Sequence, residues 1–174
     1  MSEENTTEVT IGEEVLDLAQ LAGVDMSGIQ EVRSLALPAG QYLFKIKDAK
    51  LESRETTVDD EKINRPVVDF ELEVMDCMAL VKEGLDPASV IGRKHHHSFW
   101  IKDFQLDLGR VQAFLTDIGI VGNKPLNALL NEAHGVEIVA DIINVKNRDN
   151  PDIVYANLRN IMTIVKFQAK MAGE

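Results

Sequence analysis

Residues 66–78, PVVDFELEVMDCM, form the stretch that decides the fold, because apolar and polar residues alternate in it more regularly than anywhere else in the chain. The apolar residues of one parity are Val68, Phe70, Leu72 and Val74, and the acids of the other parity are Asp69, Glu71 and Glu73. Successive side chains of a strand point to opposite faces of a sheet. The stretch therefore predicts a half-buried strand whose outer face is acidic.

Four further stretches, 41–51, 92–102, 136–146 and 153–165, are also predicted as strands. After residue 102 the apolar spacing changes from two to three or four residues, which predicts helices over 103–118 and 125–132. A short helical turn is expected at 86–89. The polar stretch 52–65 has no apolar periodicity, so we expect a long loop or a flexible hairpin tip there.

The predicted order of elements is β-β-β-α-β-β, which is the order of an OB-fold, a five-stranded, partly open Greek-key barrel. Closing the sheet would remove the unpaired edges that promote aggregation. We therefore expect a mainly β protein with helices, an OB-fold-like domain at 37–165 and a C-terminal tail at 166–174. The alternative architecture is an α+β sheet with helices on one face.

The charge of the chain is concentrated at its N-terminus. The net charge of the 174 residues is −11, and residues 1–34 hold eight acids and one base, which leaves −4 for the remainder. We expect residues 1–36 to be an acidic, largely flexible extension with a short amphipathic helix within 13–23. The segment is interpreted either as a solvated tail or as a regulatory, partner-binding tail.

Composition limits the class of protein further. Apolar residues make up 45% and charged residues 27%, as in globular proteins. A single cysteine, Cys77, excludes an intramolecular disulfide, and no apolar run approaches the roughly 20 residues that cross a bilayer. The acidic start of the chain is not typical of a signal peptide. We therefore expect a protein of the reducing cytoplasm that does not associate with membranes.

Sequence motifs give little support to catalysis or metal binding. The chain has no phosphate-binding glycine loop and no nucleophile elbow. His95 and His97 share one face of a predicted strand, with His96 on the other, and we expect packed side chains there rather than a metal site. Cys77 is expected to pack at a strand end. We predict no catalytic residue, no metal and no cofactor.

Binding of single-stranded nucleic acid requires cations that follow the phosphates and flat side chains on which bases stack. The candidates for these two roles are Lys45, Lys47, Lys94, His96, Trp100, Lys102, Lys146, Arg148, Tyr155 and Arg159. An OB-fold would bring them to its usual binding surface. The alternative is that the lysines of the first strand pair with the acids at 69, 71 and 73 across the strands.

Three segments together resemble a known group of proteins. The run Leu37-Pro38-Ala39-Gly40-Gln41-Tyr42, the strand at 67–74, and the strand that opens with Gly92-Arg93-Lys94 and ends in Phe99-Trp100-Ile101 are similar to bacteriophage-encoded OB-fold proteins of replication and recombination modules. The likeness covers about residues 37–165. Several members of that group are thought to bind single-stranded DNA.

The resemblance implies a non-catalytic, sequence-independent single-stranded-DNA-binding protein in the host-cell cytoplasm, with phage or host replication proteins as further partners. Such proteins usually carry their acidic tail at the C-terminus, whereas here it is at the N-terminus. The alternative function is an OB-like protein-interaction module whose acidic N-terminal segment recruits a partner. A third, weaker hypothesis is a divergent enzyme subunit.

Overall fold

The computed structural model describes residues 8–11, 14–17 and 36–173, and the chain divides into two compact units, Met1–Leu35 and Ala36–Glu174. In the first unit, strand β1 (Glu8–Ile11) pairs antiparallel with strand β2 (Glu14–Asp17). At Glu14–Asp17 the chain is therefore a strand and not part of the short helix predicted within 13–23. The β-branched residues of 9–11 favour a strand, and the rest of the predicted helix lies outside the described residues.

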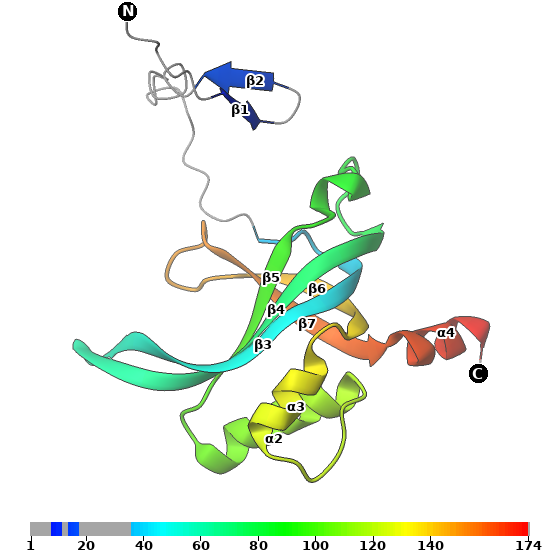
Figure 1. Cartoon of the computed structure of the whole chain (residues 1–174). Coiled ribbons are helices and arrows are strands. Elements are labelled where there is room, and N and C mark those ends of the chain that lie inside the picture. The colour runs from blue at the N-terminus through cyan, green and yellow to red at the C-terminus, as the bar shows by residue number, and fades with distance from the viewer. Residues whose placement is uncertain (1–7, 12–13, 18–35, 174) are drawn as a thin grey trace, which may run out of the picture. The chain divides into compact units, whose positions relative to one another are not determined.

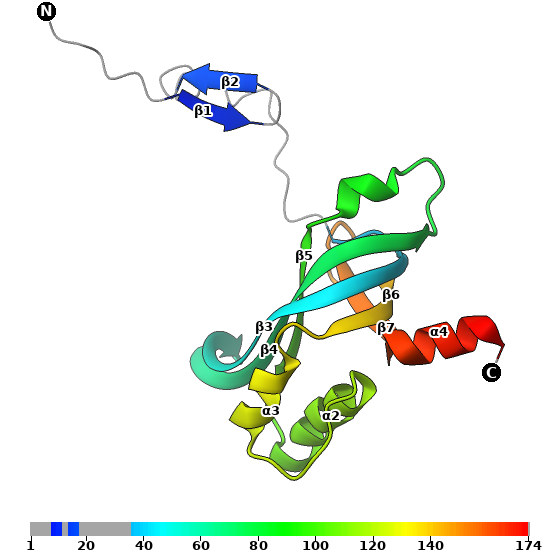
Figure 2. The same ribbon diagram turned by 45° about the vertical axis from the view of Figure 1, so that its right-hand side comes forward.

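The second unit is built on a five-stranded antiparallel sheet, which confirms the mainly β prediction. Its strands are β3 (Gly40–Val58), β4 (Glu61–Leu80), β5 (Lys94–Trp100), β6 (Glu137–Lys146) and β7 (Val154–Thr163). The spatial order is β5-β4-β3-β6-β7, and every neighbouring pair is antiparallel. Figures 1 and 2 show the sheet from two directions.

Four of these strands have a Greek-key arrangement. The order β6-β3-β4-β5 places the fourth strand of the sheet beside the first, after three strands that follow one another along the chain. The edge strands β5 and β7 do not pair with each other in the part of the chain that the structure describes. The sheet is therefore open, and the predicted barrel is not confirmed.

The stretch 52–65, predicted as a loop, is instead a two-stranded arm. β3 and β4 stay paired out to Val58 and Glu61, and the turn between them is made by Asp59 and Asp60 at φ of 50° and 64°. Two consecutive positive φ values match the primed turns that suit the twist of a hairpin. Backbone pairing thus extends the strands where no apolar pattern predicts them, and the arm projects from the sheet in Figures 1 and 2.

The helices lie between the strands and at the C-terminus. A 3-10 turn, η2 (Pro87–Val90), precedes β5, and α2 (Phe104–Asp117) and α3 (Leu126–Ala133) lie between β5 and β6, within about a residue of their predicted bounds. β7 leads directly into α4 (Ile164–Ala172), a helix without buried residues that occupies most of the predicted C-terminal tail. Thr163 caps the start of α4, and Gly173 ends it at φ 82°.

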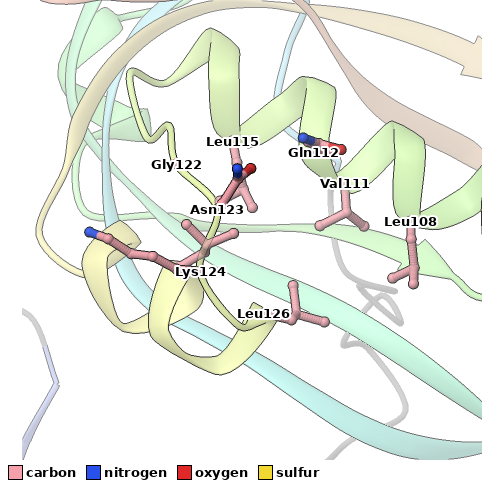
Figure 3. A pocket seen from close by; sticks show the side chains of 9 residues that line it. Leu108, Val111, Gln112, Leu115, Gly122, Asn123, Lys124 and Leu126 are labelled. Atoms are coloured by element: carbon pink, nitrogen blue, oxygen red, sulfur yellow. The ribbon is translucent and has the colours of Figure 1, made fainter.

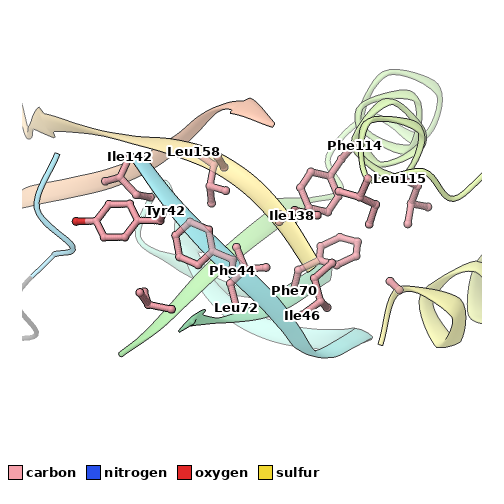
Figure 4. Packing of buried hydrophobic residues seen from close by; sticks show 14 of the residues in the cluster. Tyr42, Phe44, Ile46, Phe70, Leu72, Phe114, Leu115, Ile138, Ile142 and Leu158 are labelled. Atoms are coloured by element: carbon pink, nitrogen blue, oxygen red, sulfur yellow. The ribbon is translucent and has the colours of Figure 1, made fainter. Parts of the chain in front are cut away.

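One face of the sheet and the two central helices enclose the apolar core (Figure 4). The largest fully buried side chains come from β3 and β4 and include Tyr42, Phe44, Ile46, Phe70 and Leu72. α2 and α3 add Phe114, Leu115 and Leu130 to the cluster. The other face of β3, β4 and β5 is called the outer face below. No described helix is long and apolar enough to cross a membrane.

Candidate nucleic-acid interface

Two lysines predicted to contact phosphates lie on the outer face and are held by carboxylates. Lys94 Nζ lies 2.7 Å from Glu71 Oε1, and Lys47 Nζ lies 3.0 Å from Glu73 Oε2. The hydrogen bond to Glu71 raises the pKa of Lys94. The cross-strand pairing considered for Lys47 is therefore present, although exposed pairs of this kind contribute only about 0–1 kcal/mol.

His96 contacts a buried carboxylate on the outer face. Asp69 is 1% exposed, and its Oδ2 lies 2.8 Å from His96 Nδ1 and 3.0 Å from Arg54 Nη2. Ser98 Oγ donates a hydrogen bond to the other oxygen of Asp69. Burial acts to raise the pKa of Asp69, but the bonds from Ser98 and His96 and the charge of Arg54 outweigh it, so the pKa is lowered. The cluster links three strands. Ser98 is not arranged as a nucleophile, because its hydroxyl donates to Asp69 and not to His96.

His95 and His97 belong to the core side of β5. The ring of His97 packs edge-on against Phe99, with centroids 4.7 Å apart, and lies 5.0 Å from Phe114. Burial lowers the pKa of each histidine to about 4, so both are neutral at pH 7. No group of three metal-ligating side chains occurs within the described residues.

Trp100 is half-buried at the end of β5, directly opposite Val67. It lines a pocket of about 240 Å³ together with Ser98, Phe99, Lys102, Asp107 and Arg110. Asp107 closes one side of that pocket by accepting the backbone N–H of Lys102 at 2.8 Å and pairing with Arg110 at 3.0 Å. An indole and two cations therefore surround one hollow.

The hairpin between β6 and β7 carries three other predicted residues, Lys146, Arg148 and Tyr155. The Tyr155 side chain is 49% exposed, and its hydroxyl accepts a hydrogen bond of 2.9 Å from Asn147 Nδ2. Within residues 36–173, neither Lys146 nor Arg148 forms an ion pair. Lys146 is the ladder partner of Val154, so it points to the opposite face of the hairpin from Tyr155, whose ring is accessible on the face of Arg159.

Arg159 of β7 faces a carboxylate that other groups already occupy. Asp141 is its ladder partner, but the two oxygens of Asp141 accept amide hydrogen bonds from Gln41 at 3.1 Å and Asn160 at 2.6 Å. The guanidinium of Arg159 makes no ion pair with any described residue. It is therefore available to an external anion.

The sheet separates the predicted residues into two groups. Lys94, His96, Trp100 and Lys102 lie on or just beyond the edge strand β5, whereas Lys146, Arg148, Tyr155 and Arg159 lie on or beside the opposite edge strand β7. Lys45 and Lys47 lie on the central strand β3. In the order of the sheet, the first two groups are separated by β4, β3 and β6.

Sequence reasoning missed four residues with exposed or unpaired groups. Phe104 fits the apolar stripe of α2, yet it is 74% exposed, because the first turn of the helix extends past the core. Lys166 and Lys170 lie on α4, where no helix was predicted. Arg65 lies in the arm that was predicted as a loop, and only its position opposite Arg54 reveals its surroundings.

An apolar hollow of about 220 Å³ lies between α2 and α3 (Figure 3). Val111, Leu115 and Leu126 form its floor, and its only cation, Lys124, pairs with Glu132. It has no free charge for a phosphate. Comparisons of the chain with protein-family models and with curated proteins give no match, so the function is inferred from the residues themselves.

Proposed function

We propose that this chain is a non-catalytic, sequence-independent single-stranded-DNA-binding protein of phage DNA replication or recombination, acting in the host-cell cytoplasm. The Greek-key order of four strands supports an OB-type domain for this role, because OB-folds bind oligonucleotides. The proposed interface is the β6–β7 hairpin with β7 and α4. This interface includes only some of the ten residues that the sequence suggests.

The observation that carries the proposal is a run of unpaired cations in a chain that is otherwise acidic. Between residues 146 and 170 there are five bases and two acids, although the whole chain has a net charge of −11. None of the five bases has a carboxylate partner within residues 36–173: Lys146, Arg148, Arg159, Lys166 and Lys170. Unpaired cations can exchange small counterions for phosphates, which drives binding to nucleic acids.

Tyr155 adds a stacking platform to these cations. Its exposed ring lies on β7 four residues before Arg159, so both side chains point to the same face. Base stacking on an aromatic side chain contributes about 1–3 kcal/mol and accepts every base. The combination supports binding without sequence preference.

A titration of a fluorescent oligothymidylate tests the proposal. We expect saturable binding that weakens with salt, with a log–log slope of about −0.7 for each phosphate contacted. Arg148→Gln together with Arg159→Gln should reduce the magnitude of that slope by about 1.4. Lys124→Gln together with Lys62→Gln removes the same charge from two ion-paired positions and should leave the slope unchanged.

A second pair of variants separates the ring from the hydroxyl. Tyr155→Ala should weaken binding by about fivefold or more, whereas Tyr155→Phe keeps the ring and should bind as the unaltered chain does. Absence of saturable binding at low salt would reject the proposal. An equal slope in the two double variants would reject the β6–β7 interface.

The second candidate function is a protein-interaction module that recruits a partner through its acidic N-terminal segment, 1–36. One observation favours an apolar partner surface on the sheet domain. A hollow of about 300 Å³ lies beside the ends of β3 and β4, and it is lined by Leu80, Val81, Ile142 and Ile143 among others. Val81 is 75% exposed there. This candidate predicts no salt-dependent oligonucleotide binding and a partner that is lost when residues 1–34 are deleted.

A further inference from the structure

Three cations from three neighbouring positions of the sheet form one row on the outer face. Arg54 of β3 lies directly opposite Arg65 of β4. β5 pairs with β4 so that Trp100 lies opposite Val67, and the Ile101 N–H continues the ladder to the Pro66 carbonyl at 2.9 Å. Lys102 follows directly after this last ladder bond, where the chain leaves β4 near Arg65 and turns toward α2.

The row shares one face because strand residues two apart point the same way. Arg54 reaches Asp69, which defines the outer face, and Arg65 has the same parity as Asp69 on β4. Lys102 has the parity of Trp100. Directly opposed like charges destabilise a sheet, so an arginine facing an arginine requires a compensating anion.

Only one member of the row has such an anion. Arg54 is paired with Asp69 and Glu52. Arg65 and Lys102 have no carboxylate partner in the part of the chain that the structure describes. The Nε atom of Arg65 is also buried without a hydrogen-bond acceptor. A buried donor without an acceptor is unfavourable, and an oxyanion against the rest of the guanidinium would supply the negative charge that Arg65 lacks.

Lys102, at one end of the row, also lines a hollow. The pocket of about 240 Å³ beside it is lined by Trp100, Lys102 and Arg110. Arg110 lines the same pocket and is held by Asp107, another lining residue, at 3.0 Å. A flat indole next to converging cations can hold a base and its phosphate at the same time.

We infer that Arg65 and Lys102, supported by Arg54 and Arg110, form a nucleotide-phosphate site beside Trp100. The phosphate lies against Arg65 and Lys102, and the attached base stacks on the indole. The site is at the β5 edge of the sheet, separate from the interface proposed on β6 and β7. It can therefore bind a mononucleotide whether or not the chain binds DNA along β7.

The fluorescence of Trp100 reports on this site alone, because the chain contains one tryptophan. The full-length protein is titrated with thymidine monophosphate, with thymidine, and with inorganic phosphate as a competitor. We expect thymidine monophosphate to quench the emission, thymidine to bind about tenfold more weakly, and phosphate to reverse the quenching. The tenfold difference corresponds to one charge-assisted hydrogen bond.

Two single variants and a control on the same face identify the residues. Arg65→Gln and Lys102→Gln should each weaken thymidine monophosphate binding about tenfold. Lys94→Gln removes an equal charge from an ion-paired lysine of β5 and should have no effect. Arg65→Gln also removes the like-charge contact with Arg54, so it should unfold at an equal or higher urea concentration. If Arg65→Gln loses nucleotide binding, the cause is then not unfolding of the protein.

Two further arms distinguish the source of the phosphate and the two proposals. If the site serves a DNA strand, an oligothymidylate binds more tightly than thymidine monophosphate, and Arg65→Gln weakens the binding of each ligand. If the site serves a free nucleotide, the oligothymidylate binds no more tightly than thymidine monophosphate. Arg148→Gln with Arg159→Gln should leave thymidine monophosphate binding unchanged, even if the proposed function is wrong. The inference is overturned if Trp100 emission does not respond to the nucleotide, or if Arg65→Gln and Lys102→Gln bind it as Lys94→Gln does.

Discussion

Replacing Asp69 by alanine should destabilise the sheet far more than replacing any other acid of its strand. The carboxylate is 1% exposed and is held by Arg54, His96 and Ser98. Removing one partner of a buried, hydrogen-bonded ion pair costs about 3–5 kcal/mol. Here the partners left behind recover water, because the side chains of Arg54 and His96 are 34% and 51% exposed. We therefore expect about 3 kcal/mol, the lower end of that range.

Urea unfolding followed by far-ultraviolet circular dichroism measures this cost. With a slope near 2 kcal/mol per molar, a loss of about 3 kcal/mol lowers the midpoint by about 1.5 M. Glu73→Ala is the matched control, because Glu73 lies on the same face and strand but pairs with Lys47 at the surface. It should cost less than about 1 kcal/mol. In 1 M salt, where screening acts over about 3 Å, the small cost of Glu73→Ala should disappear and that of Asp69→Ala should remain.

Acid pH gives an independent check on Asp69. The pKa of Asp69 is lower in the folded chain than in the unfolded chain, where it is about 3.9. Its charge therefore stabilises the fold at pH values above about 3.9, and this stabilisation is lost as the pH falls through the pKa of the folded chain. The difference between the unaltered chain and Asp69→Asn should therefore narrow below about pH 4. Equal costs for Asp69→Ala and Glu73→Ala at pH 7 would refute the view that this carboxylate is buried and holds three strands together.

Two other predictions concern the buried histidines and the acidic segment. Burial lowers the pKa of His95 and His97 to about 4, below the value of about 6.5 in the unfolded chain. The free energy of unfolding should therefore be highest above about pH 6.5 and should fall on acidification, by at most about 2 kcal/mol for each imidazole at pH 5. In urea unfolding, His97→Leu should halve the loss of unfolding free energy between pH 7.5 and pH 5. An unchanged loss would show that protonation of other groups causes it. Deleting residues 1–34 removes a net charge of −7; oligonucleotide binding should tighten at low salt and change little at high salt, whereas weaker binding at low salt would contradict the electrostatic argument.

The strands that pack on the core could be predicted because their sequence carries the pattern of burial. In residues 66–78 the structure buries Val68, Phe70 and Leu72 on the core side, while Glu71 and Glu73 stay partly exposed on the outer face. The change to a spacing of three or four residues likewise locates α2 and α3. Burial of one face imposes a period on the sequence, and that period is what can be read.

Elements that bury little left no such pattern. In the β3–β4 arm beyond Ser53, the two strands pair with each other and with no other described strand, so backbone hydrogen bonds form it without a core-facing stripe. Helix α4 has no buried residue, so its apolar positions were not distinguishable from a tail. Arg54, Arg65 and Lys102 come from three separate segments, and only the strand register places them in one row.

Net charge was a poor guide to the candidate site for a related physical reason. A phosphate responds to cations within about 10 Å, the screening length at ordinary salt, and not to the −11 of the whole chain. On the outer face, Lys47 of the central strand β3 and Lys94 of β5 are each matched by a carboxylate of β4, so these two lysines offer no net attraction. Unpaired cations remain at the β5 edge and along β7. An anionic ligand is therefore expected at those two edges, each beside its own aromatic ring, Trp100 or Tyr155, and mutations of the two paired lysines should change stability more than binding.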